Sequence, residues 1–214
     1  MNKETITPIP LPTIRRFPAY LRLLKAYEIK REYWVSATKL AVDLNLKPIQ
    51  VRKDMSCTGV EGKPKVGFKI HDLIHAIEHH LGWDNTSDAI LVGAGNLGHA
   101  LIGYKGFENY GLHIMAVFDS DENKIGSRVC GITVLPMNQL KYTIERLGIH
   151  IAIITVPAEA AQEVADQLVV SGIKGVWNFA PKNLHLPEHI IVQRTDLATS
   201  FAELSSRIKK VIEK

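Results

Sequence analysis

At 214 residues, with 46% hydrophobic residues and a formal net charge of +4, the chain is long enough for one large domain or two small ones, and two is the better interpretation. Its only two cysteines, Cys57 and Cys130, lack C-x-x-C spacing, which argues against a disulfide framework or a cysteine metal site. No apolar run reaches the roughly 18 to 20 residues of a membrane span, and residues 1–5 do not lead into a signal-peptide core, so we expect a cytoplasmic protein without membrane association.

Charge is distributed unevenly along the chain. Residues 1–69 contain 14 Lys and Arg but 6 Asp and Glu, whereas residues 70–214 contain 12 and 16. A basic module joined to an acidic one is typical of a protein whose first part meets a polyanion such as nucleic acid. The alternative is a solvated basic face that has no partner.

Two helices are predicted at the start of the basic part. A lead that contains Pro8, Pro10 and Pro12 should be extended, and apolar residues at helical spacing then predict a helix over residues 17–27. Ser36 is a good N-cap for a second helix, whose apolar stripe ends before a turn at residues 45–46.

A third helix is predicted over residues 48–56, where proline stands at a permitted first-turn position. Ile49, Val51 and Met55 are expected to face the core, and Asp54 to cap or pair locally. The outward side chains then include amide and cationic groups that suit base edges and phosphates. This pattern is typical of a helix-turn-helix.

Residues 60–70 read as a short basic hairpin, which would be the wing of a winged helix. Polar and cationic residues of the helices and the wing are therefore the candidate contacts to double-stranded DNA. They are Ser36, Lys47, Gln50, Arg52, Lys53, Ser56, Lys63 and Lys65. The alternative is an ordinary solvated helix face.

A connector helix is predicted over residues 71–81, followed by a domain boundary within residues 82–87. His71, His75 and His79 recur every fourth residue and can chelate a metal on one helix face. Because no carboxylate or cysteine stands at matched spacing, a solvated linker helix is the better interpretation, and we expect no metal.

From Ala89 onward, apolar strands alternate with helices. The predicted strands cover residues 90–92, 114–118, 151–155, 176–179 and 190–192. This alternation indicates an α/β fold with a doubly wound parallel sheet. The last segment, residues 197–214, is predicted to be a helix whose apolar stripe needs a partner surface.

A glycine-rich turn follows the first of these strands. Gly93, Gly95 and Gly98 form a G-x-G-x-x-G pattern, and Asp119 ends the next strand. In such a turn the first glycine allows the tight bend, the second lets the backbone approach a pyrophosphate, and the third lets the helix pack closely. Asp119 can accept hydrogen bonds from both adenosine ribose hydroxyls and would repel a 2′-phosphate. The sequence therefore predicts a dinucleotide-binding (Rossmann) domain that prefers NAD(H) to NADP(H).

Several separated blocks resemble the Rex family of redox-sensing transcriptional repressors, over nearly the whole chain. They are Arg16-Phe17-Pro18-x-Tyr20, Gln50-Val51-Arg52-Lys53-Asp54, Val92-Gly93-Ala94-Gly95-Asn96-Leu97-Gly98, Phe118-Asp119, Ile154-Thr155-Val156-Pro157-Ala158-Glu159-x-Ala161-Gln162 and Gly172-Ile173-Lys174-Gly175-x-x-Asn178-Phe179-Ala180-Pro181. The resemblance implies a homodimer in which each winged helix reads half of an operator and the C-terminal helices are exchanged. It also implies that NADH closes the dimer and releases DNA, with NAD⁺ a weaker competitor.

The resemblance also implies which residues act. Tyr104 matches the tyrosine that senses NADH, Asp196 matches the aspartate that this tyrosine engages, and Arg16 matches the arginine that takes the same aspartate in the DNA-bound form. One carboxylate with two competing partners would be a bistable switch. The alternative is a surface ion pair of roughly 0–1 kcal/mol, which switches nothing. The candidate cofactor-binding residues are Gly93, Ala94, Gly95, Asn96, Leu97, Gly98, Tyr104, Asp119, Thr155, Val156, Pro157, Asn178 and Phe179.

The chain departs from the family pattern at three places. Residues 55–59 lack two aromatic side chains that usually follow the charged block of the third helix. Pro64 and Lys65 stand in the wing where an arginine and a glycine are usual, and Leu197 stands where some members carry phenylalanine. We expect these changes to affect the operator sequence, the DNA affinity and the discrimination between NADH and NAD⁺.

The combined prediction divides the chain into three parts: a winged-helix DNA-binding domain with its connector helix (residues 1–84), a Rossmann NAD(H)-binding domain (85–194) and a dimerising helix (195–214). An NAD-dependent oxidoreductase is the main alternative, but the nucleotide fold occupies residues 88–192 and leaves little room for a substrate domain, so we expect no catalysis.

Two further alternatives remain open. Residues 151–179 also resemble the CoA-binding domains of acyl-CoA ligases, although His185 and His189 lack a phosphohistidine motif. The altered wing raises the third alternative, a cofactor-sensing dimer whose winged helix contacts protein instead of DNA.

Overall fold

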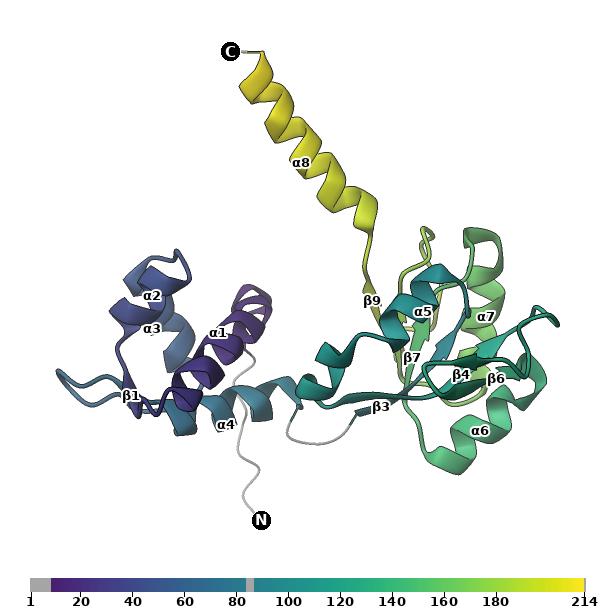
Figure 1. Ribbon diagram of the computed structural model, residues 1–214, viewed down its shortest axis with the longest axis horizontal. Coiled ribbons are helices and arrows are strands. Elements are labelled where there is room, and N and C mark those ends of the chain that lie inside the picture. Colours follow the sequence, from purple (N-terminus) through teal and green to yellow (C-terminus); the bar gives the residue numbers. More distant parts are fainter. Residues whose placement is uncertain (1–8, 84–86, 214) are drawn as a thin grey trace. The chain divides into compact units, whose positions relative to one another are not determined.

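The computed structural model describes residues 9–83 and 87–213. The chain folds into two compact units, residues 1–85 (unit 1) and 86–214 (unit 2) (Figure 1). The predicted boundary after residue 84 falls within residues 84–86, and together with Pro8 it lies outside the described residues.

The described part of unit 1, residues 9–83, is built from four helices that follow the predicted order. They are α1 (Leu11–Ile29), α2 (Ala37–Asp43), α3 (Pro48–Ser56) and α4 (Ile70–Leu81). The lead was expected to stay extended through Pro12, and this is wrong because α1 already begins after Pro10. Pro12 then lies in the first turn, where the missing N–H of proline leaves no helical hydrogen bond unmade. Ser36 caps α2 by accepting a hydrogen bond from the backbone N–H of Lys39.

The wing follows α3 and is anchored by a short antiparallel pair that sequence periodicity did not indicate. β1 (Trp34–Val35) pairs with β2 (Phe68–Lys69), and an isolated bridge joins Lys63 to Gly67. At Gly67 φ is +108°, and a Cβ there would lie 2.2 Å from the backbone oxygen of Val35. Glycine therefore lets the returning arm of the wing cross β1.

The core of unit 1 corrects two expectations. Helix α4 was expected to be a connector, but its residues Leu73, Ile74 and Ile77 are buried in one cluster with residues of α1, α2 and α3. It is therefore part of the core of unit 1 as well as the segment that leads out of it. Ile49 was expected to face this core, but its side chain is 57% exposed. It lies in the first turn of α3, while Val51 and Met55 fill the buried side.

Unit 2 contains the predicted doubly wound sheet. In the described residues it has seven strands in the order β5-β6-β4-β3-β7-β8-β9. The strands are β3 (Ser87–Val92), β4 (Leu112–Asp119), β5 (Arg128–Val129), β6 (Ile132–Pro136), β7 (Ile151–Ile154), β8 (Gly175–Asn178) and β9 (Ile191–Arg194). All neighbouring pairs are parallel except β5 with β6, a hairpin that the sequence did not predict.

This strand order positions the site. β3 lies between β4 and β7, so the chain reverses its direction of winding at β3, and ligands bind beyond the carboxyl ends of strands at such a point. Helices α6 (Leu140–Leu147) and α7 (Ala158–Val170) pack on one face, and α5 (Asn96–Ile102) packs on the other (Figure 1). The short 3-10 helices η1 (Lys105–Tyr110) and η2 (Met137–Gln139) complete the unit.

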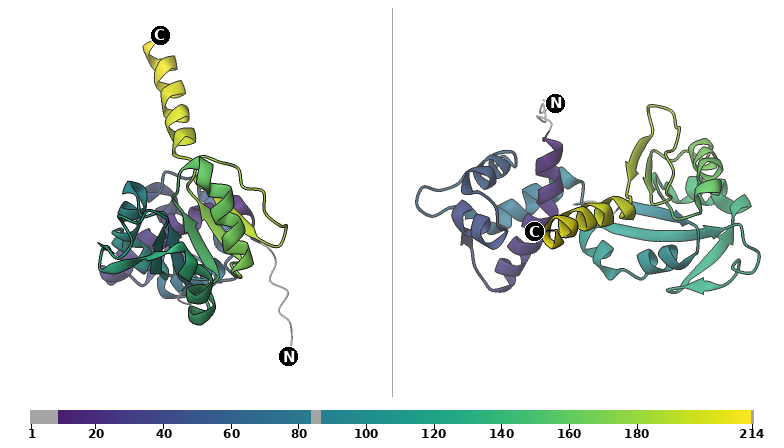
Figure 2. Two further views of the ribbon diagram at one scale, coloured as in Figure 1. Left: turned by 90° about the vertical axis from the view of Figure 1, so that its right-hand side faces the viewer. Right: turned by 90° about the horizontal axis from the view of Figure 1, so that it is seen from above.

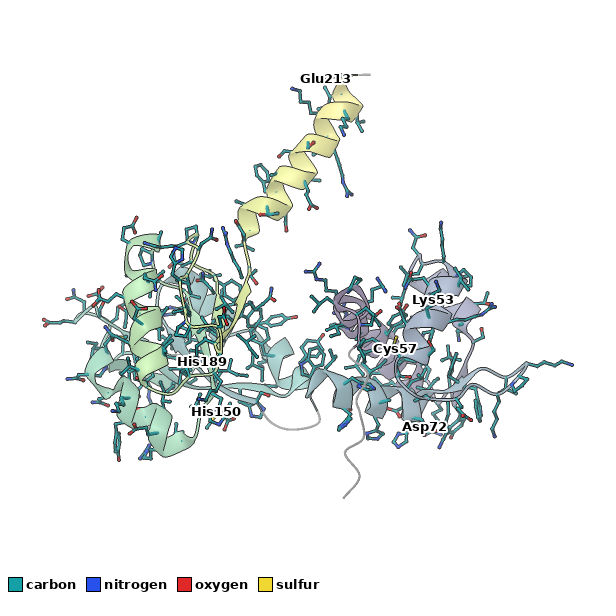
Figure 3. The ribbon with its side chains drawn as sticks, turned by 180° about the vertical axis from the view of Figure 1, so that it is seen from behind. Lys53, Cys57, Asp72, His150, His189 and Glu213 are labelled. Carbon is teal, nitrogen blue, oxygen red and sulfur yellow. The ribbon has the colours of Figure 1, made fainter. Side chains whose placement is uncertain are left out.

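The C-terminal helix α8 (Leu197–Ile212) leaves the sheet after β9 (Figure 2). Not one of its residues is buried, and the side chains along it as far as Glu213 stand clear of the sheet (Figure 3). Its exposed apolar stripe comprises Leu197, Phe201, Leu204, Ile208 and Val211. Across residues 9–83 and 87–213, the structure contains no helix with the length and apolarity needed to cross a membrane.

Candidate functional site

A cavity of about 440 Å³ opens at the carboxyl ends of β3, β4 and β7. Its volume lies within the range of small-molecule sites. The predicted residues on its wall are Gly93, Gly95, Leu97, Asp119, Thr155, Val156, Pro157 and Phe179. The structure therefore brings most of the predicted cofactor residues together from distant parts of the chain.

The three glycines have different surroundings. A Cβ on Gly93, where φ is +108°, would lie 2.8 Å from the Thr155 carbonyl carbon, and a Cβ on Gly98 would lie 2.1 Å from the Gly93 oxygen. The turn is therefore closed by backbone on these two sides. At Gly95 a Cβ would meet no described atom within 4 Å, and this glycine lines the cavity. Gly93 and Gly98 thus serve the fold, whereas Gly95 leaves space for a ligand.

Asp119 closes the cavity at the end of β4, where its side chain is almost fully buried. Its Oδ2 accepts hydrogen bonds from the Ala94 N–H (2.8 Å) and from Lys124 Nζ (3.1 Å), and its Oδ1 accepts one from the Asp121 N–H (2.9 Å). Burial acts to raise the pKa of Asp119, but these hydrogen bonds outweigh it and hold the pKa below the ordinary value. The carboxylate is therefore charged and fixed in place before any ligand binds.

The remaining predicted cofactor residues lie off the cavity wall. Ala94 is buried behind Asp119, and Gly98 packs inside the turn. The side chain of Asn178 is buried, accepts from the Ala180 N–H and donates to the Lys182 oxygen, so it shapes the loop after β8. Asn96 opens α5.

Sequence reasoning missed several residues of the wall. They are Val92, Ser120, Lys124, Met137, Ala160, Val164 and Pro181. Lys124 is the one among them that carries charge. The signal for it was local, because the polar Asp121-Glu122-Asn123 segment is typical of a tight turn that returns the next side chain toward the preceding strand.

Tyr104 lies outside the cavity wall but is connected to it by a row of aromatic rings. Tyr104 packs edge-on against Phe107 (ring centroids 4.9 Å apart), and Phe107 packs edge-on against Trp177 (5.7 Å). Trp177 packs at a tilt against Phe179 of the wall (4.9 Å). Each contact has the separation of favourable aromatic pairs. The Tyr104 side chain itself remains 54% exposed and available to a partner group.

Asp196, the expected partner of Tyr104, is the N-cap of α8. Its Oδ1 accepts from the Ala198 N–H (3.0 Å), and its Oδ2 accepts from Arg194 Nη2 (2.7 Å). The neighbouring Thr195 accepts a hydrogen bond from Trp177 Nε1 (2.8 Å). Trp177 therefore contacts both the aromatic row of Tyr104 and the residue beside Asp196. Sequence reasoning did not find Arg194 or this role of Trp177.

A groove of about 370 Å³ in unit 1 lies between α2, α3 and the wing. Ser36, Arg52, Lys63 and Lys65 of the predicted DNA contacts line it, and Thr38, which was not predicted, joins them. Lys47, Lys53 and Ser56 are exposed on α3 or just before it. Lys63 Nζ lies 4.8 Å from the centre of the Trp34 ring, which positions one wing cation against β1.

A buried hydrogen-bond network corrects the expectation for Asp54. This residue is fully buried, and its carboxylate accepts from Thr13 (3.0 Å), Tyr20 (2.8 Å), Gln50 (3.0 Å) and both Nε and Nη2 of Arg16 (2.7 Å each). The expected local pair forms with Gln50, four residues earlier on α3, but the expectation missed the other three donor residues, which come from α1. Gln50, predicted to face DNA, is half-buried and directs its amide to Asp54.

The network holds Asp54 and Arg16 in their charged forms. Burial acts to raise the pKa of Asp54, but the hydrogen bonds from Arg16, Tyr20, Thr13 and Gln50 hold it below the ordinary value. The same Asp54 hydrogen bond raises the pKa of Arg16. The forked contact between guanidinium and carboxylate is the strong form of an ion pair. It attaches the candidate recognition helix α3 to α1.

The three histidines of the connector helix α4 are not gathered into a metal-binding group in the described structure. Among the described residues, no group of three or more His, Cys, Asp or Glu side chains is placed to hold a metal ion. The rings of His71 and His75 pack edge-on with centroids 4.3 Å apart, and His71 Nδ1 lies 3.3 Å from Glu28 Oε1.

Each of the two units matches a different known domain family. Residues 8–56 match the family described as putative DNA-binding protein N-terminus, and residues 84–182 match the family described as CoA binding domain. The first match covers the helices that surround the groove, and the second covers the glycine turn and its cavity.

Relatives of known function match both units together. The redox-sensing transcriptional repressor Rex of Treponema denticola is 45% identical over 90% of this chain and 92% of its own length, and that of Bacteroides fragilis is 37% identical over 94% and 92%. These relatives are named as repressors and not as enzymes.

Solved structures agree with this assignment. The crystal structure of RSP in complex with β-NAD⁺ and operator DNA has a TM-score of 0.89 and 31% identity, covering 95% of this chain and 94% of RSP. The structure of RSP with β-NADH has a TM-score of 0.83 and 30% identity, covering 95% and 96%. RSP is a Rex-family repressor. The chain described here therefore belongs to the Rex family of redox-sensing transcriptional repressors.

Proposed function

We propose that the protein is a cytoplasmic, homodimeric transcriptional repressor that senses the NADH/NAD⁺ ratio. It binds operator DNA when NADH is low and releases it when NADH binds. The observation that carries this proposal is the presence in one chain of a cationic groove on a winged helix and a glycine-lined cavity that ends at a fixed, charged aspartate. The names of the relatives, and the complexes of RSP with NAD⁺, NADH and operator DNA, support it.

The cavity residues favour a dinucleotide as the ligand. The open space at Gly95 suits a pyrophosphate, and Asp119 suits the adenosine ribose. Within the described part of the wall, Asp119 and Lys124 are the titratable side chains, and they are bonded to each other. A dehydrogenase needs a proton donor or acceptor beside the nicotinamide, so this wall favours sensing over catalysis.

We further propose Arg16, Tyr104 and Asp196 as the switch. Arg16 already binds Asp54 through Nε and Nη2, and in the described residues its Nη1 group donates to no protein atom. Asp196 can therefore take the Nη1 edge in the DNA-bound form without displacing Asp54. In the NADH-bound form it would turn to the exposed Tyr104 hydroxyl, whose ring is linked to the cavity through Phe107, Trp177 and Phe179.

The proposed function is tested by measuring NADH binding calorimetrically with Asp119→Ala. We expect wild-type protein to bind NADH, and the variant to bind at least about tenfold more weakly, because a charged hydrogen-bond acceptor is lost. DNA affinity without NADH should stay the same. Asp166→Ala, which removes an exposed carboxylate of α7 outside the cavity, is the matched control. No NADH binding by wild-type protein would refute the proposal.

For Arg52→Ala we predict weaker DNA binding, by about tenfold, with unchanged NADH affinity. Arg52 is exposed on α3 and lines the groove with the wing, and a lost base or phosphate contact costs about 1–3 kcal/mol. Fluorescence anisotropy of labelled operator at fixed salt measures the change. Lys30→Ala, at the exposed C-terminal end of α1 and outside this groove, is the control. Equal DNA affinity of Arg52→Ala and wild type would remove Arg52 from the interface.

Gly106→Ala is expected to weaken the response to NADH while leaving DNA affinity without NADH unchanged. A Cβ at Gly106 would lie 2.4–2.6 Å from the ring and hydroxyl of Tyr104, so the mobile end of Tyr104 has to move. The NADH concentration that releases half of the bound DNA should rise severalfold. Tyr104→Phe, which removes the hydroxyl without a clash, should shift it in the same direction. An unchanged midpoint in both variants would exclude Tyr104 from the switch.

A further inference from the structure

A lysine of the cavity wall carries an inference that deepens, and rests on, the proposed function. Lys124 lies in the turn that follows β4, where its backbone N–H donates to the Asp121 oxygen (3.0 Å). The turn returns its side chain to the cavity, with Nζ 3.1 Å from Asp119 Oδ2 and 3.7 Å from Asp121 Oδ2. About two fifths of the side chain is exposed, so the ammonium group is accessible from the cavity.

The hydrogen bonds of Asp119 limit what this residue can do for a ribose. A carboxylate has about four acceptor positions, two on each oxygen. Oδ2 already accepts from the Ala94 N–H and from Lys124, and Oδ1 already accepts from the Asp121 N–H. One position on Oδ1 remains. The sequence-based expectation that Asp119 accepts from both ribose hydroxyls therefore needs a second binding group for one of them.

Lys124 has the chemistry to be that group. Its ammonium has three donors and no acceptor, and one donor is directed to Asp119. A second can be given to the oxygen of the hydroxyl that Asp119 does not hold. The pair then binds a vicinal diol from both sides, because the carboxylate accepts a hydrogen from one hydroxyl and the ammonium donates one to the other.

Lys124 also affects how strongly the site repels the 2′-phosphate of NADP(H). Asp119 and Asp121 bring two negative charges to this end of the cavity, and Lys124 offsets one of them. The end is thus left with a single net negative charge. Neutralising Asp119 would leave Lys124 without its closest counter-charge and free to bind a phosphate.

We infer that Lys124 is a second ribose-binding and specificity-determining residue of the dinucleotide site, holding one ribose hydroxyl and setting how strongly the site rejects a 2′-phosphate. Asp119 then selects NAD(H) over NADP(H) only together with Lys124.

Calorimetric titration of the full chain with NADH and with NADPH tests this inference. Lys124→Met should bind NADH about tenfold more weakly, and Lys124→Arg should recover most of the loss because it keeps the charge and donors. Lys141→Met removes an exposed lysine of α6 outside the cavity and should behave as wild type.

NADPH separates a binding role from a merely structural one. Asp119→Asn should bind NADPH at least about tenfold more tightly than wild type, and the double variant Asp119→Asn/Lys124→Met should lose that gain. If Lys124 only fixed Asp119 in place, the single and double variants would bind NADPH equally.

Each negative outcome has a distinct meaning. If wild-type protein and Lys124→Met bind NADH with equal affinity, or if the double variant keeps the NADPH gain, the inference is overturned while the proposed function stands. If wild-type protein binds neither NADH nor NAD⁺, the proposed function fails and the inference falls with it. Thermal unfolding of every variant establishes that differences in affinity arise in the folded protein.

Discussion

Gly95→Ala is expected to lose NADH binding, by about 100-fold or more, in a protein that unfolds at the same temperature as wild type. The backbone at Gly95 has φ −87° and ψ −173°, which alanine adopts freely, and its Cβ would meet no described atom within 4 Å. The added methyl group instead occupies cavity space where the backbone must approach the pyrophosphate. Loss of one or two charged hydrogen bonds gives the expected magnitude.

Gly98→Ala should instead destabilise the fold. Its Cβ would lie 2.1 Å from the Gly93 oxygen, a backbone atom that cannot rotate away, so the turn itself has to open. We expect a loss of about 3 kcal/mol or more in the free energy of unfolding, as in severe overpacking. Calorimetry with NADH and thermal unfolding distinguish the two variants.

Gly175→Ala is the control for both glycine variants, because its nearest neighbour would be 4.0 Å away and it lies off the cavity wall. Tight NADH binding by Gly95→Ala would show that no ligand approaches this glycine, and would contradict the assignment of the cavity.

Asp54→Ala should be among the most destabilising substitutions in unit 1. It removes a fully buried carboxylate that binds Thr13, Arg16, Tyr20 and Gln50, and it leaves the buried Tyr20 hydroxyl without its acceptor. Breaking a buried pair by removing one partner costs about 3–5 kcal/mol. Because this network attaches α3 to α1, DNA affinity should fall with stability even though Asp54 itself faces away from solvent.

An exposed ion pair of the same unit provides the comparison. Asp72 pairs with Lys69 on the surface at the start of α4, where both side chains are about half exposed. Asp72→Ala should cost no more than about 1 kcal/mol in urea unfolding. A similarly small loss for Asp54→Ala would mean that the buried network contributes nothing net to the fold.

The lowered pKa of Asp54 also predicts a pH dependence. A carboxyl group whose folded-state pKa is depressed stabilises the fold fully above its unfolded-state pKa, about 3.9. That contribution is lost as the pH falls through the folded-state value. In urea unfolding between pH 7 and pH 3, wild-type unit 1 should therefore lose stability more steeply below about pH 4 than Asp54→Asn does. Parallel curves would contradict the depressed pKa.

The sequence predicted what depends on local spacing. Apolar periodicity located α2, α3 and α4 and five strands of the sheet, and the glycine spacing located the turn that closes on Thr155. It also gave Asp119 at the end of β4, because an acidic residue ending the second strand is part of the same pattern.

The errors concern features that depend on distant residues or on very short elements. Asp54 was expected to pair locally, yet its strongest partner, Arg16, is 38 positions away. β1 and β5 have two residues each, too few to show a period, and the β5–β6 hairpin turns at Cys130-Gly131, where both residues have positive φ. Ile49 was placed on the wrong side of α3 because it lies in the first turn of the helix. Too few residues precede it there to show which face is buried. Lys124 is a different case, because its signal was local: the polar turn that follows β4 returns its side chain to Asp119, five positions earlier.

A redox-sensing repressor must release its operator when NADH binds, and this release can be measured directly. Fluorescence anisotropy of a labelled duplex from the upstream region of the protein's own gene, titrated with protein at fixed salt, establishes binding, and NADH or NAD⁺ is then added to the complex. We expect specific binding that NADH reverses at a far lower concentration than NAD⁺. Specific binding that NADH leaves intact, or no specific binding on this duplex or on a randomised library, would contradict the account.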